Sequence, residues 1–210
     1  MTSSNADLVK STANAHGEAR ITITTSNGYK FVSKLDYDMC TTPVQQNRPV
    51  VSMIGTSLQR YVNSKLGTLY FAMELDRRLR EAGVENVLVN AAHPGQAGKT
   101  GLGDWEHSFM SPSAVKIFKS FVFLGFLISH TTEDAAKTQT YVSANKRISE
   151  ERIHGELWIP TYSLWPTPWS WMGYTGSITE KLQPHAADMA EWKKLWEFCE
   201  EAVKKAEGKK

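Results

Sequence analysis

The most constraining feature of the sequence is a strand–helix–strand pattern in its first half. ARITITTS at 19–26 alternates β-branched residues and runs into Asn-Gly, which is typical of a strand followed by a turn. From about 56 to 82, apolar side chains recur at near-helical spacing, and Gly83 is placed to end that helix. The apolar run ENVLVNAAHPG at 85–95 fits a strand that is buried on both faces. This order predicts a βαβ unit with a parallel sheet.

The second half of the chain continues the alternation of helices and strands. After a glycine-rich loop, helical patterns cover roughly 112–129 and 131–145, and GELWIPTYS at 155–163 predicts a third strand. Segment 164–174 is rich in Trp and Pro and predicts an irregular loop. The amphipathic pattern at 187–207 predicts a last helix, with its apolar side chains on one stripe. We therefore expect an α/β fold with about three parallel strands and flanking helices.

Composition limits the classes of function. The 210 residues are 41% apolar and 22% charged, which fits a single globular domain over residues 1–210. A net charge of +2 gives no basic surface for nucleic acid. The N-terminus has no signal-peptide pattern, and the apolar stretch at 118–129 is too short for a membrane span, so we expect a cytoplasmic protein. Cys40 and Cys199 match no metal-ligand or redox spacing, and we predict no metal site.

The stretch RYVNSKLG contains the residues with the clearest potential for chemistry. Tyr61 and Lys65 are four positions apart, so a helix places both on one face. A phenol has a reference pKa of ~10, and a nearby ammonium group favours its ionised form. Tyr61 could then exchange a proton with an alcohol or a carbonyl. On spacing alone, however, such a pair is usually a half-buried ring beside a solvated lysine.

The residues around this pair resemble a known family. YVNSKLGTLYFAMELDRRLREAGVENVLVNAAHPG resembles the short-chain dehydrogenase/reductase family, most closely its retinol-dehydrogenase-like and fungal members. The likeness extends back to ARITITTSNG and forward through TYVSANKRISEERIHGELWIP to the last helix. It implies a partial Rossmann-like fold that corresponds to the C-terminal part of the family's domain. It also implies NAD(P)-dependent oxidoreduction of a small lipophilic alcohol or ketone, plausible in fungal secondary metabolism.

The resemblance assigns roles to particular catalytic residues. It implies that Tyr61 is the acid–base catalyst and that Lys65 lowers its pKa while holding the nicotinamide ribose. Ser26 would orient and polarise the oxygen of the substrate. Thr25 competes for that role, because the hydroxyl run TTS leaves the register open by one residue.

The resemblance also implies cofactor contacts further along the chain. Pro94 and Gly95 match the turn that backs the nicotinamide ring. Thr100 matches a cofactor-contacting threonine, although one extra residue separates it from the Pro-Gly pair. The cofactor would be NADP or NAD.

Part of the family pattern has no counterpart in this sequence. Before Tyr61 the only glycines are Gly17, Gly28 and Gly55, and these cannot form the Gly-rich turn that binds the pyrophosphate. We therefore expect an N-terminally truncated domain whose chain alone binds cofactor weakly or not at all. The first strand would lack its neighbour, leaving an open edge and uncovered apolar faces. A homo-oligomer or a second chain would cover them. The long interval between Ser26 and Tyr61 predicts a surface loop, with a pocket-shaping insertion as the alternative.

Other functions compete with this one. The same residues could catalyse a cofactor-independent isomerisation, cyclisation or dehydration, since none of these needs a hydride donor. The chain could also be a binding protein or a remnant without activity. A P-loop is disfavoured because His93 stands where that motif needs glycine. Several aromatic residues could line a lipophilic pocket or belong to an ordinary core: Trp165, Trp169, Trp171, Phe121, Phe123 and Phe126.

Overall fold

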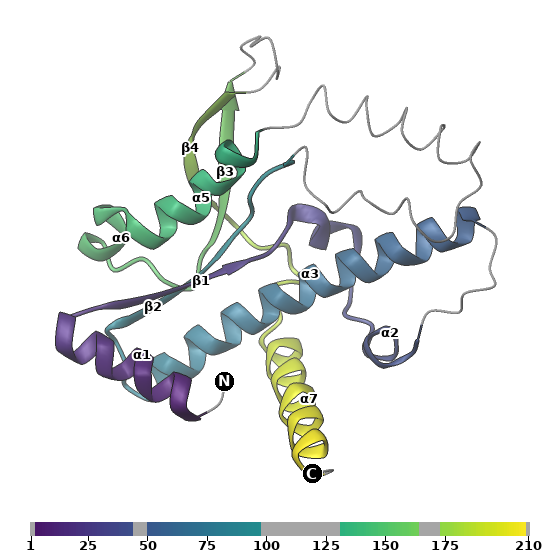
Figure 1. Cartoon of the computed structure of the whole chain (residues 1–210), viewed down its shortest axis with the longest axis horizontal. Helices are drawn as coiled ribbons and strands as arrows, with labels where there is room; N and C mark the ends of the chain where they lie inside the picture. Colours follow the sequence, from purple (N-terminus) through teal and green to yellow (C-terminus); the bar gives the residue numbers. More distant parts are fainter. Residues whose placement is uncertain (1–2, 44–49, 98–130, 164–172, 209–210) are drawn as a thin grey trace.

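The computed structural model describes residues 3–43, 50–97, 131–163 and 173–208. The elements are helix α1 (Ser3–His16), strand β1 (Ala19–Thr24), 3₁₀-helix η1 (Asn27–Phe31), helices α2 (Tyr37–Thr41) and α3 (Val50–Glu81), strand β2 (Val87–Ala92), helices α5 (Thr132–Ala144) and α6 (Lys146–Glu150), strands β3 (Leu157–Ser163) and β4 (Gly173–Glu180), and helix α7 (Met189–Glu207) (Figure 1). The strands form a single sheet in the order β1-β2-β3-β4.

The predicted βαβ unit is confirmed. Strands β1 and β2 pair in parallel from Ala19 opposite Val87 to Thr24 opposite Ala92, and β3 adds a third parallel strand. Helix α3 connects β1 to β2 and ends at Glu81, before Gly83 turns the chain with a φ of 68°. The fold is therefore α/β and partially Rossmann-like, as expected. The predicted start of α3 near residue 56 is wrong, because the helix begins at Val50.

Strand β4 was not predicted. It pairs antiparallel with β3, with an irregularity between Thr161 and Tyr162. The predicted irregular loop at 164–174 is therefore wrong at its end, where β4 begins; residues 164–172 lie outside the described residues. Two glycines interrupt β4, so its sequence lacks a clear alternating pattern. Pairing with β3 and a buried hydroxyl contact, 3.2 Å between Ser177 Oγ and Thr138 Oγ1 on α5, hold it in place. Of the helices predicted between β2 and β3, the second is confirmed as α5, and the first, at 112–129, is outside the described residues.

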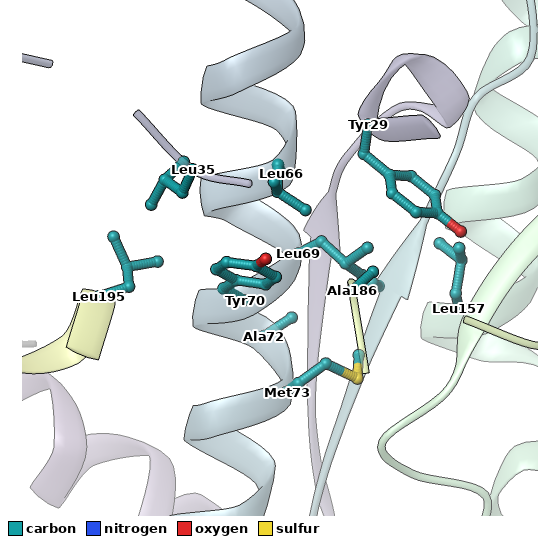
Figure 2. Close-up of a cluster of buried hydrophobic side chains, with 11 residues drawn as sticks. Tyr29, Leu35, Leu66, Leu69, Tyr70, Ala72, Met73, Leu157, Ala186 and Leu195 are labelled. Atoms are coloured by element: carbon teal, nitrogen blue, oxygen red, sulfur yellow. The ribbon is translucent and has the colours of Figure 1, made fainter. Parts of the chain in front are cut away.

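The two faces of β2 pack against different helices. Val87, Val89 and Ala91 face α3, whereas Leu88 and Ala92 face α5 and α6. This alternation explains why the strand is apolar throughout. Figure 2 shows the larger cluster around α3, which contains Tyr29, Leu35, Leu66, Leu69, Tyr70, Ala72, Met73, Ala91, Leu157, Ala186 and Leu195.

The segment between β1 and α3 differs from the predicted surface loop. It forms η1 and α2, and its Tyr29 and Leu35 are buried in the cluster around α3. The prediction was wrong because these apolar residues follow no helical or strand period. They are buried because the segment folds back onto α3, which local spacing does not reveal.

Strand β1 is the edge strand among the described residues. The expectation of uncovered apolar faces is wrong there. On one face, Val9 and Ala13 of α1 pack with Ile21. On the other, Arg20 donates a hydrogen bond to the carbonyl of Asn145, 2.9 Å away. Helix α1 and the α5–α6 segment therefore cover part of both faces of β1, whose residues are half-buried as far as Ile23, and its backbone edge is open.

Self-association through this edge stays a prediction. The outer N–H and C=O groups of a parallel edge strand can pair with another chain. We expect purified protein to form a dimer or a larger assembly, which light scattering measures. A monodisperse monomer at all accessible concentrations would contradict this expectation.

No helix in the described ranges is both long and apolar enough to cross a membrane.

Candidate active site

A cleft of about 1320 Å³ opens where β1 and β2 end. Its lining comes from the residues that follow β1, the residues that follow β2 and one face of α3. In open α/β sheets, ligands bind outside the carboxyl ends of parallel strands, and this cleft has that position. Four of the predicted site residues line it together: Ser26, Tyr61, Pro94 and Gly95.

Tyr61 and Lys65 lie on neighbouring turns of α3, as their spacing predicted. The ammonium nitrogen of Lys65 is 5.5 Å from the centre of the Tyr61 ring. Tyr61 lines the cleft and both side chains are partly exposed, so solvent or a ligand can reach them. Within the described ranges, no carboxylate forms an ion pair with Lys65. Its positive charge is therefore available to a ligand or to the phenol oxygen of Tyr61.

The structure separates the two hydroxyl residues that the sequence left open. Thr25 is 1% exposed, and its Oγ1 donates a hydrogen bond to the carbonyl of Lys65 at 2.7 Å. Ser26 lines the cleft, and its Oγ accepts a hydrogen bond of 3.2 Å from the N–H of Gly28. Because Ser26 Oγ is the acceptor there, its own proton remains available for a ligand. The geometry favours Ser26 for substrate contact and gives Thr25 a supporting position beneath α3.

Gly95 occupies a position where any side chain would be strained and would force Tyr162 to move. Its φ is 83°, and a Cβ built there would lie 1.7 Å from the phenol oxygen of Tyr162 on β3. Burial raises the pKa of Tyr162, so this phenol stays neutral at physiological pH. The Pro94–Gly95 backbone thus lies directly against Tyr162. This close packing holds the wall of the cleft that follows β2.

Sequence reasoning missed several cleft residues. Phe31, 84% exposed, and Leu58, 59% exposed, line the cleft with large apolar surfaces, and His93 follows β2 directly. The sequence could not predict these residues, because it does not show which large apolar side chains stay exposed or that Phe31 and Leu58 meet at one cleft. Lys30 and Lys34 also line the cleft, but their ammonium groups pair with Glu180 and Glu191 at 2.6 and 3.4 Å.

Other predicted features are not placed by the structure. Thr100 lies outside the described residues, as do the six aromatic residues considered for a lipophilic pocket. Asp36 is exposed and caps α2 by accepting a hydrogen bond of 2.9 Å from the N–H of Met39. Among the described residues, no cluster of three potential ligands could hold a metal ion.

Comparisons with known proteins point to the same family as the motif. No protein-family model matches the chain. A short-chain dehydrogenase/reductase of Armillaria gallica is 28% identical over 183 residues, which cover 87% of this chain and 47% of that protein. A second protein of the same name and organism is 27% identical over 187 residues, covering 89% and 48%. Both relatives carry the name of the family that the residues around Tyr61 resemble. The chain spans about half the length of the curated relatives it matches.

One solved structure adds support for the fold. An uncharacterized protein from Mycobacterium paratuberculosis superposes with a TM-score of 0.52 at 17% identity. The match covers 89% of this chain and 51% of that one. At this identity the likeness concerns the arrangement of helices and strands, and it agrees with the α/β assignment.

Proposed function

We propose that this chain carries the proton-transfer site of a short-chain dehydrogenase/reductase that interconverts an alcohol and a ketone. The observation that carries the proposal is the cleft at the ends of β1 and β2. It is lined by Ser26, Tyr61 and the Pro94–Gly95 turn, and Lys65 lies beside the Tyr61 ring. A hydroxyl donor, a phenol and an ammonium group near one cleft are the groups that a carbonyl reduction needs from the protein.

Each side chain has a definite task in this reaction. Ser26 donates a hydrogen bond to the oxygen of the substrate and orients it. Tyr61 gives its proton to that oxygen as the carbonyl becomes an alcohol, and takes the proton back in the reverse direction. The Lys65 ammonium stabilises the negative charge left on the phenol oxygen. Thr25 ties the end of β1 to α3 and so holds Ser26 near Tyr61.

The cleft fits one end of a nicotinamide cofactor, NADP or NAD. A bound nicotinamide would supply or accept the hydride. Gly95 offers a backbone surface with no side chain, and Lys65 offers a cation for the ribose hydroxyls. By contrast, no Gly-rich turn at a helix start, of the kind that binds pyrophosphate, occurs among the described residues. The chain thus has residues suited to the nicotinamide end, and the pyrophosphate half has no counterpart in the described ranges.

We expect this chain to bind NADPH or NADH far more weakly than a relative with a Gly-rich turn, with dissociation constants in the millimolar range. The reason is that the amide groups of a helix start supply much of the affinity for a dinucleotide pyrophosphate. Calorimetric titration measures the constants. Lys65→Met should weaken any residual binding, because it removes the cation beside Tyr61. Micromolar binding by the chain alone would contradict the expectation.

The same observation favours a second candidate function. A cleft with proton-transfer groups and without a pyrophosphate site in the described residues could catalyse isomerisation, cyclisation or dehydration. These reactions move protons and need no hydride donor. Incubating a lipophilic ketone with and without NADPH separates the two functions, since only oxidoreduction depends on the cofactor.

The setting of the reaction is also proposed. The exposed apolar side chains of Phe31 and Leu58 suit a small lipophilic substrate. Both curated relatives come from a fungus, which is consistent with a role in fungal secondary metabolism. We also propose a cytoplasmic location, where Cys40 and Cys199 would stay reduced.

A further inference from the structure

The side chain of Asn63 on α3 forms two hydrogen bonds with the segment that follows β1. Its side chain is 3% exposed. Its Oδ1 accepts a hydrogen bond of 2.8 Å from the N–H of Asp36, and its Nδ2 donates one of 2.9 Å to the carbonyl of the same residue. One side-chain amide thus satisfies both backbone groups of Asp36. Because Asp36 caps α2, this contact fixes the start of that helix on α3.

Arg60 fixes the other end of α2. Its two terminal nitrogens donate hydrogen bonds to the carbonyls of Met39 and Thr42, at 2.7 and 2.6 Å. Leu35 precedes Asp36 in the sequence and is buried against α3. A Cβ built on Gly67 of α3 would lie 3.6 Å from the Cδ1 atom of Leu35. We call residues 32–42 the clamped segment. Three contacts hold it, and all three use the same helix that carries Tyr61.

The clamped segment and the adjoining Phe31 form one side of the cleft. Phe31, Val32 and Met39 contribute apolar surface there. Two lysines also line this side: Lys30 pairs with Glu180 at 2.6 Å, and the largely exposed Lys34 pairs with Glu191 at 3.4 Å. The Asp36 carboxylate accepts the N–H of Met39. The surface that this wall offers to a ligand is therefore mainly apolar.

We propose that Asn63, assisted by Arg60, is a positioning residue that holds the clamped segment as the substrate-selecting wall of the cleft, and that this wall selects for apolar surface on the substrate. Asn63 and Arg60 lie within two positions of Tyr61 on α3. The helix that carries the phenol therefore also sets the distance to the apolar wall. The inference rests on the proposed function only in assuming that the cleft binds the substrate.

The first readout is hydrogen exchange, which needs no turnover. In Asn63→Ala, the amides of Asp36 and Met39 should exchange about tenfold faster or more, because a buried hydrogen-bond partner has been removed. Asn63→Asp keeps an acceptor for the Asp36 N–H but turns a buried carboxylate oxygen toward the carbonyl of Asp36, so it should not restore the wild-type exchange. Asn86→Ala is the matched control. This variant removes the 3.2 Å hydrogen bond that Asn86 Nδ2 donates to Asn14 Oδ1, and neither residue belongs to the clamped segment.

The second readout is the binding of straight-chain alcohols of increasing length, followed by calorimetry. Against a fixed apolar wall, affinity should rise by up to about fourfold per methylene. In Asn63→Ala this increment should shrink while the shortest alcohols bind as before.

Two results would overturn the inference. Unchanged exchange in Asn63→Ala would show that Asn63 does not hold the segment. An unchanged chain-length increment, or no increment in the wild type, would show that the segment is not the selecting wall. Neither readout uses hydride transfer, so failure of the proposed oxidoreduction would appear separately, in the turnover of the wild type and Tyr61→Phe.

Discussion

Replacing Tyr61 with Phe should lower turnover by ~10²–10⁴-fold, the usual cost of losing a general acid or base. The substitution keeps the ring beside Lys65 and removes only the transferable proton. Stability should change little, because the phenol is partly exposed at the cleft. The measurement is reduction of lipophilic ketones with NADPH, together with the cofactor-free isomerisation assay. Both assays are needed because the proton transfer is common to both proposed functions.

Lys65→Met serves as a companion variant, and it should also impair turnover by removing the charge that stabilises the phenol oxygen. If both side chains are only structural, Tyr61→Phe will be nearly silent and Lys65→Met will alter only packing or solubility. Full activity in Tyr61→Phe would remove the catalytic interpretation and leave a binding protein or a remnant.

Replacing Glu74 with Ala should destabilise the fold by about 1–3 kcal/mol, the range for losing buried hydrogen bonds to charged groups when solvent can still reach the remaining partners. The Glu74 side chain is 0% exposed, and it accepts hydrogen bonds of 2.7 Å from the guanidinium groups of Arg77 and Arg78. Removing the carboxylate leaves these donors without their buried acceptor. Urea denaturation measures the loss. Glu81→Ala is a matched control, because Glu81 also pairs with Arg77 but is 64% exposed, and it should cost less than about 1 kcal/mol.

The interaction of Glu74 with Arg77 and Arg78 also predicts that the free energy of unfolding depends on pH. Burial alone would raise the pKa of Glu74, but the hydrogen bonds and charges of Arg77 and Arg78 outweigh it and lower the pKa. The ionised carboxylate therefore stabilises the fold fully above the unfolded-state pKa of ~4.3, and this contribution is lost as the pH falls through the lower folded-state pKa. The stability difference between wild type and Glu74→Gln should shrink below about pH 4. A difference that stays constant during acidification would contradict the assignment.

The sequence was sufficient to predict the parts of the fold that follow a regular period. Strand β1, most of α3, the fully buried β2 and the final helix α7 could be predicted because their apolar residues repeat at strand or helix spacing and glycines mark their ends. The four-residue spacing of Tyr61 and Lys65 also sufficed to place both on one side of α3. These features depend on local geometry alone.

The remaining features depend on contacts between residues distant in the sequence. Strand β4 is stabilised by pairing with β3, and α2 by Asn63 and Arg60 some two dozen positions later. No local pattern reports such contacts. The choice between Thr25 and Ser26 likewise depends on where β1 ends, because each residue along a strand reverses the direction of the side chain. The hydrogen bond from Thr25 to Lys65 resolves it only in three dimensions.

The parallel pairing of β1 with β2 has a consequence for how the cleft comes into being. The ladder joins Ala19 to Val87, so 68 positions of chain must close before its first bond forms (87 − 19). Loop closure of this kind costs entropy before any contact compensates for it, which makes parallel crossovers slow to fold. Ser26 stands at one end of the crossover, Tyr61 in its middle and Gly95 at the other end. The three are all in place only once this crossover has closed, so the complete cleft depends on the pairing of β1 with β2.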